Sequence, residues 1–459
     1  MDFHHVLSQI ERPFTFAVVG DTHFTLPEFS PDPGVRRTAL RPLDVDQYVE
    51  NVDYVLSPMM DALKAEAPAF VVMTGDLVEG HGDPGRAEIQ AGLDFFDSYG
   101  LPLLIARGNR DRAEAFGEVV QPYLSGVLGR ELEAGYYFTD VAGCRLVVLD
   151  STTWKRGGEQ HRWLEDVLKQ SQHNDIDRTF LFGHHPIWPV ARAFFTNLDF
   201  CRDMPELLER YPVDAFFCGH THNQSIIMHR TGRQPVLQFM GAPIGLPGEI
   251  PTPLDQVQAL LPSPDDLLTC WPGYLENTAP GWFTVRVGRQ SVRVAWHHLN
   301  RGAETTVRWR RRGDLTAFRE MTYPPDARLI YSDLNHIRRA CLRFCAWDAL
   351  QPGKRVVLNG KEIGVLPPGN AFAPGRMELP AWALGGLRME NRIEILASED
   401  EASTVGNLVL EAVLPGGRFV RTRPTGEIFT WSDRWDAWRL RTLRKVAPGR
   451  SIVTLLSFW

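Results

Sequence analysis

The chain has 459 residues, of which 44% are hydrophobic and 23% are charged, and it carries a net charge of -7. This length is too great for one ordinary core, so two domains are expected, and the composition is typical of a globular protein. The negative charge argues against a general binder of nucleic acids or anionic membranes, although bound metal ions could still hold an anionic substrate.

Residues 1–12 contain acidic side chains and no apolar stretch, so no signal peptide is expected. No segment approaches the roughly 18 apolar residues of a membrane-spanning helix. The six cysteines include no CxxC pair and predict neither a disulfide framework nor a zinc ribbon. A cytoplasmic location without a membrane span is therefore expected.

Short apolar segments alternate with helix-like stretches up to about residue 220, which predicts βαβ units with partly parallel pairing. Five of the apolar segments are followed by glycine and a polar residue. Since ligands bind outside the carboxyl ends of strands in such sheets, these polar residues are expected to gather at one edge. The predicted strands are 14–19, 69–73, 101–106, 136–141, 145–149, 179–182 and 214–218, and the predicted helices are 44–64, 88–98, 159–170 and 205–210.

Antiparallel strands are predicted next, over residues 226–230, 236–240, 282–287 and 292–296. Residues 241–280 are rich in proline and glycine and predict a long loop. This loop either forms a wall of the ligand site expected at the strand ends or is an ordered excursion on the surface. The basic run 308–312 is interpreted as a solvated linker or edge strand in preference to a nucleic-acid patch.

The C-terminal region alternates polar and apolar residues, and it contains the hairpin-turn dipeptide Asn359-Gly360. This pattern predicts an antiparallel β-sandwich, and the hairpin resembles one found in jelly-roll and galactose-binding-like modules. Some such modules bind sugars, and Trp431, Trp435 or Trp438 could contact a glycan. Tryptophans more often anchor cores or domain interfaces, and we favour that interpretation.

The polar residues after the five strands are carboxylates, an amide and imidazoles. This donor set suits Mn, Fe, Zn or Co rather than Ca or a soft thiolate metal. A carboxylate can bridge two ions about 3.5–4 Å apart, and such a pair can activate water and clamp a phosphoryl group. A single Gly-Asp or His-x-His is only a turn signal or a chance pair, but the ordered placement of all five is hard to obtain by chance. The predicted donors are Asp21, His23, Asp76, Asn109, His184, His220 and His222.

The motif set resembles that of the calcineurin-like metallophosphoesterase superfamily over roughly residues 14–297. The resemblance implies an α/β fold with two mixed β-sheets packed as a sandwich and flanked by helices. It also implies two transition-metal ions, such as Mn, Fe or Zn. One would be held by Asp21, His23 and His222 and the other by Asn109, His184 and His220, with Asp76 bridging them.

The resemblance further implies hydrolysis of a phosphoester by in-line attack of a hydroxide shared by the two metals. The family motif usually has histidine after the asparagine, but this chain has Arg110 followed by Asp111. Arginine cannot act as a general acid, although it can bind phosphate oxygens with two parallel hydrogen bonds. We therefore expect a phosphodiester or diphosphate bond with a good leaving group, with Arg110 and Asp111 as candidate catalytic residues. The superfamily branch that hydrolyses the diphosphate of UDP-diacylglucosamine also carries Gly-Asn-Arg-Asp.

His81 and His185 are alternative acids, although a supporting structural role is favoured for both. The expected partner is a small phosphorylated substrate, nucleotide- or sugar-linked, and no nucleic acid. The alternatives are a phosphomonoesterase and a non-catalytic scaffold that binds protein partners. The predicted organisation is a metallophosphoesterase domain over 1–300, a linker over 301–325 and a β-sandwich over 326–459.

Overall fold

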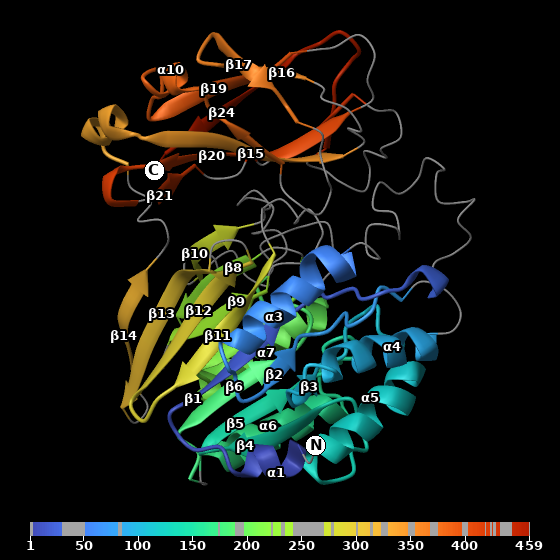
Figure 1. Ribbon diagram of the computed structural model, residues 1–459. Helices are drawn as coiled ribbons and strands as arrows, with labels where there is room; N and C mark the ends of the chain where they lie inside the picture. The colour runs from blue at the N-terminus through green and yellow to red at the C-terminus, as the bar shows by residue number, and fades with distance from the viewer. Residues whose placement is uncertain are drawn as a thin grey trace.

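The computed structural model places two groups of sheets along the chain (Figure 1). We call residues 3–322 the first unit and residues 329–458 the C-terminal module. The structure describes residues 3–29, 51–80, 85–172, 175–188, 197–221, 224–230, 235–241, 270–276, 280–299, 302–312, 315–322, 329–347, 354–367, 375–396, 403–417, 419–422, 425, 428–431 and 443–458.

The first sheet of the first unit has seven strands in the order β14-β13-β12-β11-β1-β2-β3. Strands β1, β2 and β3 are parallel, and the other strands pair antiparallel. The strands are β1 (Phe14–Val19), β2 (Val71–Met73), β3 (Leu103–Ile105), β11 (Gly281–Val287), β12 (Ser291–His298), β13 (Gly302–Arg312) and β14 (Leu315–Thr322).

The second sheet also has seven strands, in the order β10-β8-β9-β7-β6-β5-β4. Strands β5, β6, β7 and β9 are parallel to one another, whereas β4, β8 and β10 pair antiparallel. Both sheets are therefore mixed, as predicted. The strands are β4 (Tyr137–Val141), β5 (Cys144–Val148), β6 (Arg178–Phe182), β7 (Ala215–Cys218), β8 (Gln224–Arg230), β9 (Pro235–Met240) and β10 (Cys270–Glu276).

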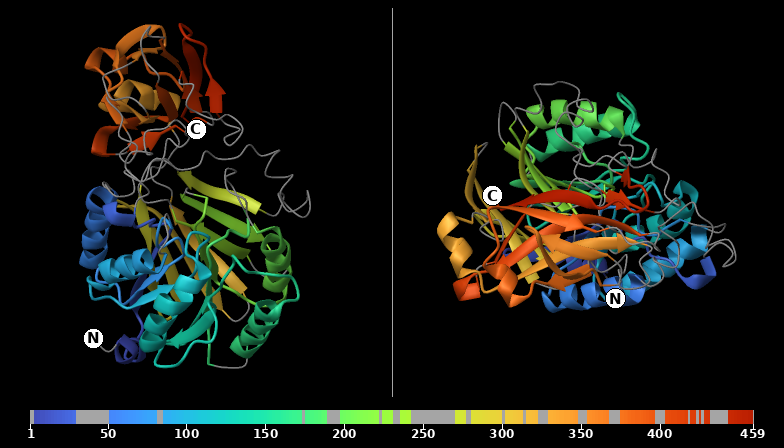
Figure 2. Two further views of the ribbon diagram at one scale, coloured as in Figure 1. Left: turned by 90° about the vertical axis from the view of Figure 1, so that its right-hand side faces the viewer. Right: turned by 90° about the horizontal axis from the view of Figure 1, so that it is seen from above.

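The two sheets pack face to face, and helices cover their outer sides (Figure 2). Between the sheets, Phe16 of β1 meets Phe180 and Phe182 of β6, with ring centroids 5.8 and 6.1 Å apart. Helices α3, α4 and α5 cover the first sheet, and α6 and α7 pack on the second. The predicted sandwich flanked by helices is confirmed. The helical segments are α1 (Phe3–Ser8), η1 (Pro27–Phe29), η2 (Val52–Leu56), α3 (Ser57–Ala65), α4 (Gly85–Asp97), α5 (Ala113–Leu128), α6 (Glu159–Ser171) and α7 (Leu198–Arg210).

Two helices differ from the prediction. The sequence pattern did not indicate α5, whose helix signal is weakened by Pro122 within it. Helix α7 begins at Leu198, well before the predicted residue 205, because the side chain of Asn197 caps it by accepting from the Phe200 N–H at 3.2 Å. Residues 44–50 of the predicted first helix lie outside the described residues.

The predicted linker at 301–325 is replaced, over its described residues, by the β13–β14 hairpin, which extends the first sheet. Trp309 of β13 is buried, and its indole N–H donates to Asp214 Oδ1 at 3.1 Å. The basic run thus belongs to a strand of the sheet. Strand β10 replaces the end of the predicted 241–280 loop, and residues 242–269 lie outside the described residues.

The C-terminal module has two sheets, one ordered β18-β15-β20-β22-β23 with β21 beside β20, and the other ordered β17-β16-β19-β24. The pairing is antiparallel as predicted, except that β22 and β23 are parallel. The elements are η3 (Tyr331–His336), β15 (Arg339–Trp347), β16 (Arg355–Leu358), β17 (Lys361–Val365), β18 (Gly375–Glu378), α10 (Ala381–Leu384), β19 (Glu390–Ile395), β20 (Thr404–Val413), η4 (Pro415–Gly417), β21 (Phe419–Arg421), β22 (Ile428–Thr430), β23 (Leu443–Lys445) and β24 (Ile452–Ser457).

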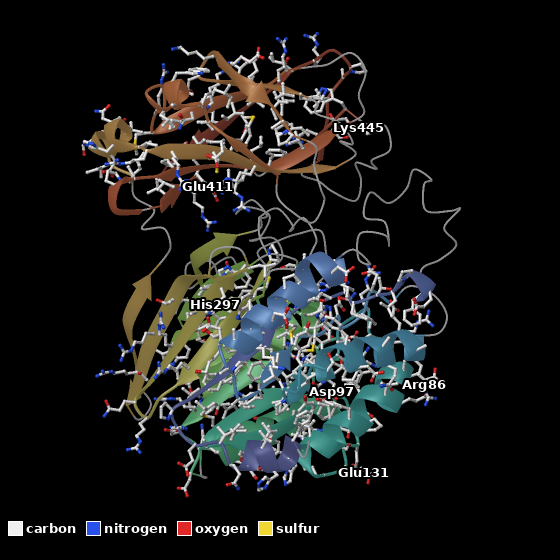
Figure 3. The ribbon with its side chains drawn as sticks, in the orientation of Figure 1. Arg86, Asp97, Glu131, His297, Glu411 and Lys445 are labelled. Atoms are coloured by element: carbon white, nitrogen blue, oxygen red, sulfur yellow. The ribbon has the colours of Figure 1, made fainter. Side chains whose placement is uncertain are left out.

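The C-terminal module has its own apolar core, separate from those of the first unit. Its predicted hairpin is present, with Asn359 and Gly360 at φ 49° and 87° in the turn between β16 and β17. A buried ion pair joins Arg343 to Glu411 at 3.4 Å (Figure 3 labels Glu411). Within the described ranges, no helix has the length and apolar character needed to cross a membrane.

Candidate metal centre

The predicted donors lie on strand-end loops with unusual backbone geometry. Asp21, His23, Asp76 and His220 have φ values of 48°, 45°, 50° and 76°. Among the described residues, three other non-glycine positions share this left-handed region. Such a conformation costs about 1–3 kcal/mol and is concentrated at functional sites in proteins. The surrounding loops must therefore hold these four residues in place.

The loops after β1 and β2 hold each other through their backbones. The N–H of Asp21 donates to the carbonyl of Gly75 at 3.2 Å, and the N–H of His23 donates to the carbonyl of Asp76 at 2.9 Å. The Asp21 carboxylate also accepts the backbone N–H of His220 at 2.8 Å. Three strand-end loops from both sheets therefore meet at Asp21, as the sequence predicted for this edge.

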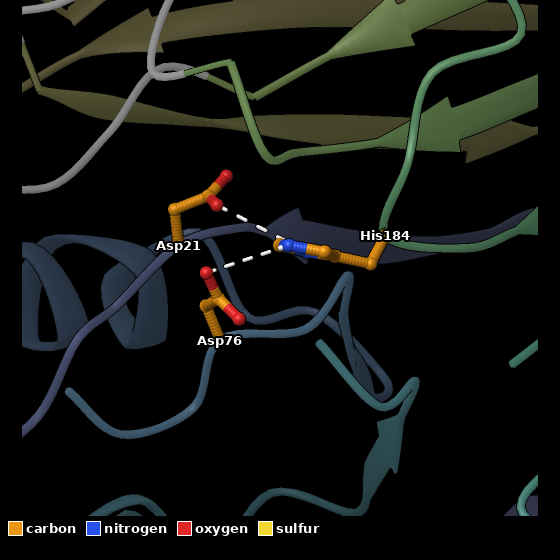
Figure 4. A group of neighbouring side chains, drawn as sticks. All are labelled: Asp21, Asp76 and His184. Atoms are coloured by element: carbon orange, nitrogen blue, oxygen red, sulfur yellow. Dashed lines mark ion pairs between the residues drawn. The ribbon is translucent and has the colours of Figure 1, made fainter. Parts of the chain in front are cut away.

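The Asp76 carboxylate lies between two of the predicted histidine donors. One oxygen, Oδ1, accepts the backbone N–H of Arg110 at 2.8 Å. The other, Oδ2, is 3.4 Å from His184 Nε2 and 3.7 Å from His23 Nε2. Asp21, Asp76 and His184 form a buried group whose donor atoms all lie within 4.8 Å of one another (Figure 4). The position of Oδ2 suits a carboxylate shared by two ions.

A second set of donors converges beside Asp76. Asn109 Oδ1 is 2.8 Å from both His184 Nε2 and His220 Nδ1, and these two nitrogens are 3.1 Å apart. His184 Nδ1 is 3.0 Å from the carbonyl of Thr74, to which it must donate, so Nε2 carries a lone pair in the neutral ring. The Asn109 oxygen and, in its neutral ring, His184 Nε2 therefore present lone pairs to the same point, an arrangement that a cation there would stabilise. The donor set fits a transition-metal site.

The pKa values of the buried donors show the same demand for positive charge. Burial raises the pKa of Asp21 to about 6. Burial alone would lower the pKa of His184, but the nearby Asp76 and Asp21 carboxylates raise it to about 9. Burial opposes ionisation of Asp76 as well, yet the charges of His184 and His23 hold its pKa below its ordinary range.

Asn109 is exposed and Arg110 is partly exposed, so this side of the site is open to solvent. Asp111 is different, because it is fully buried and its two oxygens accept backbone N–H groups, from Gly108 at 2.8 Å and from Val78 at 3.3 Å. Of the two predicted catalytic residues, Arg110 alone is placed to meet a ligand, and Asp111 braces the loop.

His185 lies next to the site but does not share the environment of a proton donor. Its Nδ1 is 3.1 Å from Ser151 Oγ, and its ring centroid is 4.3 Å from that of His220. Burial and the charge of His220 hold the pKa of His185 well below 6.5, so the neutral ring is favoured. A charged acid at this position is disfavoured. His81 and His222 lie outside the described residues.

Ser151 and Glu79 contribute to the site, although the sequence pattern did not indicate either. Ser151 Oγ accepts the backbone N–H groups of His184 and His185, at 3.1 and 2.8 Å. Glu79 Oε2 is 2.7 Å from His23 Nδ1. Each follows a strand end by a few residues, and Glu79 also lies three residues after Asp76, which are the signals that the sequence contains for them.

Residues 14–224 match the sequence model of a family described as calcineurin-like phosphoesterase. These residues form a calcineurin-like phosphoesterase domain. The matched range contains every predicted metal donor and the interlocked strand-end loops. The predicted resemblance to this family is thus confirmed over residues 14–224.

Curated relatives of the calcineurin-like domain include two kinds of protein. Glycerophosphodiester phosphodiesterase GpdQ of Enterobacter lignolyticus is 31% identical over 196 residues, which are 40% of this chain and 66% of that protein. Tartrate-resistant acid phosphatase type 5 of Oryctolagus cuniculus is 30% identical over 82 residues, which are 18% of this chain and 24% of that protein. The chain thus spans less than two thirds of the length of these relatives.

Solved structures similar to this chain include a purple acid phosphatase, PPD1, from yellow lupin, with a TM-score of 0.46 and 14% identity. That likeness covers 64% of this chain and 53% of the lupin chain. A dimetal phosphatase from Danio rerio has a TM-score of 0.43 and 15% identity, covering 63% of this chain and 97% of that chain.

Proposed function

We propose that the first unit is a dinuclear-metal phosphoester hydrolase that favours phosphodiester or diphosphate bonds. The observation that carries the proposal is the convergence of Asn109 Oδ1, His184 Nε2 and His220 Nδ1 beside Asp76 Oδ2. Hydrolysis is also the activity named for both curated relatives, one a phosphodiesterase and the other a phosphatase.

The residues of the chain would hold two transition-metal ions such as Mn, Fe or Zn. Asp21, His23 and His222 would bind one ion, Asn109, His184 and His220 the other, and Asp76 both. When bound, two such ions activate water and neutralise charge on the phosphoryl oxygens. Thr74 and Ser151 would fix the orientation of His184 through its ring and backbone nitrogens.

Arg110 supports the preference for a diester or diphosphate bond. Its guanidinium can bind phosphoryl oxygens but cannot give a proton to the leaving group. His185, held neutral beside Ser151, does not replace that proton donor. A bond whose leaving group departs without a proton is therefore expected to react fastest. The likeness to a glycerophosphodiester phosphodiesterase supports a diester as the substrate bond.

A substrate panel with added Mn²⁺ tests this preference. Bis(p-nitrophenyl) phosphate and a nucleoside diphosphate sugar should turn over at least about 10-fold faster, by kcat/KM, than an alkyl phosphomonoester. Arg110→His should lower the ratio of kcat/KM for these substrates to kcat/KM for the alkyl monoester, because a histidine at position 110 can donate a proton to the leaving group. Faster hydrolysis of the alkyl monoester by the native chain would favour a phosphomonoesterase instead, the activity named for the acid phosphatase relative. No hydrolysis of any substrate, together with no bound metal, would favour a non-catalytic scaffold.

A glycan contact through Trp431 has little support. Its indole N–H donates to the carbonyl of Arg450 at 2.8 Å, and Lys354 Nζ lies 4.3 Å from the ring centroid. The side chain packs against the core of the C-terminal module, which favours a structural role. Trp435 and Trp438 lie outside the described residues.

A further inference from the structure

Glu79 lies between a predicted metal ligand and the arginine that replaces the usual family histidine. Its Oε2 is 2.7 Å from His23 Nδ1, and its Oε1 is 3.3 Å from Arg110 Nη1. The Glu79 side chain is 2% exposed, whereas that of Arg110 is 36% exposed. One buried carboxylate thus contacts both the metal side and the solvent side of the site.

The loop that carries Glu79 is fixed on both flanks. Its N–H donates to the carbonyl of Phe24 at 3.1 Å, and Phe24 and Val78 form a parallel bridge beyond the ends of β1 and β2. On the other flank, Gly80 has φ 69° and packs against the backbone of Arg110, where a Cβ would come within 2.5 Å of the carbonyl oxygen. The position of Glu79 is therefore set by the backbone.

The two contacts of Glu79 have different chemical consequences. A carboxylate that accepts the Nδ1 proton of His23 leaves Nε2, which faces Asp76, available to bind a metal ion. The other carboxylate oxygen restrains the Arg110 guanidinium. Arginine has five N–H donors, so it can contact Glu79 and a phosphoryl oxygen at the same time.

We propose that Glu79 is a positioning residue that couples Arg110 to the metal ligand His23, so that metal binding and phosphate binding support each other through one carboxylate. The proposal rests on the metal and phosphate chemistry proposed above for this site. Coupling of this kind is reciprocal for binding. Under this proposal the metal centre sets the position of Arg110 through Glu79, whereas an ordinary surface arginine would move freely.

A double-mutant cycle with inorganic phosphate and Mn²⁺ as probes tests the coupling. Titration calorimetry would give phosphate affinity for the Mn²⁺-loaded native chain, Glu79→Gln, Arg110→Met and the double variant. Each single substitution should weaken phosphate binding about 10-fold, and the double variant should be no weaker than Arg110→Met alone, because Glu79 acts through Arg110. Effects that multiply, or unchanged phosphate affinity in Glu79→Gln, would overturn the proposal.

Mn²⁺ affinity of the chelator-treated protein gives a second readout. Glu79→Gln should lose about 10- to 100-fold, as is typical when a partner of a ligating histidine is removed, whereas Arg110→Met should change it by less than about 3-fold. Equal losses in both variants would overturn the assignment. Glu411→Gln is the matched control, since Glu411 is another buried carboxylate but pairs with Arg343 of the C-terminal module at 3.4 Å, and it should leave both affinities unchanged.

Glu79→Asp guards against misfolding of Glu79→Gln. It keeps the charge but is shorter, so it should lose the contact with one of the two partners and weaken phosphate or Mn²⁺ binding. Native affinity for both probes in Glu79→Asp would contradict the proposal. Neither binding assay requires turnover. If the native chain were inactive, the proposed hydrolase function would be contradicted, but the double-mutant cycle would still test the role of Glu79.

Discussion

Glycines at the strand ends of the first unit and in the turns of the C-terminal module have different neighbours. A Cβ on Gly108 would collide with the backbone and carboxylate of Asp76, and one on Gly219 would collide with the Asp21 carboxylate. A Cβ on Gly360 or Gly449 would meet no atom within 4 Å. Glycine in these C-terminal turns serves backbone conformation, whereas Gly108 and Gly219 let neighbouring loops approach the donor carboxylates. The closeness of those loops therefore creates the site.

The largest effect expected from this contrast is that of Gly108→Ala. The added methyl group would displace Asp76, so metal affinity and hydrolysis should each fall by more than about 100-fold, the upper end for loss of an outer partner of a metal ligand. Gly449→Ala in the C-terminal module, at φ 73°, should cost only about 1 kcal/mol of stability and leave activity unchanged. Metal content and kcat/KM should be measured for both variants. Similar losses in Gly108→Ala and Gly449→Ala would contradict the difference proposed between the two regions.

A smaller effect is expected in the core of the C-terminal module. Leu342 is fully buried in a core separate from those of the first unit, so Leu342→Ala should destabilise the module by about 2–5 kcal/mol. Thermal unfolding should show an earlier transition, while kcat at 25 °C stays within about twofold, because no donor of the site belongs to this core. A proportional loss of kcat would show that the C-terminal module supports the metal centre.

The smallest effect concerns Glu88, a buried carboxylate of the first unit outside the donor set. Burial raises its pKa to about 7 from an ordinary value of 4.5. Its contribution to stability is therefore greatest below about pH 4.5 and is lost as the pH rises through 7. At pH 8, Glu88→Gln should raise the free energy of unfolding by up to about 3 kcal/mol, seen as a higher melting temperature. At pH 5 the substitution should change the melting temperature little. A gain that does not grow with pH would contradict the assignment.

The sequence was most informative where a local pattern decides the structure. Apolar runs ending in glycine and a polar residue predicted β1 and the loops that hold Asp21, Asp76 and Asn109. The turn at Asn359-Gly360 was predicted in the same way. These patterns are local in the sequence, and the structure contains the strand, loops and turn that they predict.

Features that depend on distant contacts were not predictable in this way. The β13–β14 hairpin joins the first sheet through pairing with β12, which no local pattern in residues 301–325 reveals. Glu79 gains its position from the packing of its loop against Phe24 and Arg110. The sequence does not indicate helix α5, because Pro122 disfavours a helix. In the structure, burial of the apolar side chains of α5 in the core of the first unit outweighs that preference.

The metal content of Asp76→Asn tests the central claim most directly. Asp76 Oδ2 lies near both His184 Nε2 and His23 Nε2, at 3.4 and 3.7 Å, so loss of this charge should disturb both ions. After saturation with Mn²⁺ and removal of free metal, the native chain should retain about two ions, and Asp76→Asn should retain fewer than one and lose hydrolysis of bis(p-nitrophenyl) phosphate. Two tightly held ions in Asp76→Asn, or none in the native chain, would contradict a dinuclear centre bridged by this carboxylate.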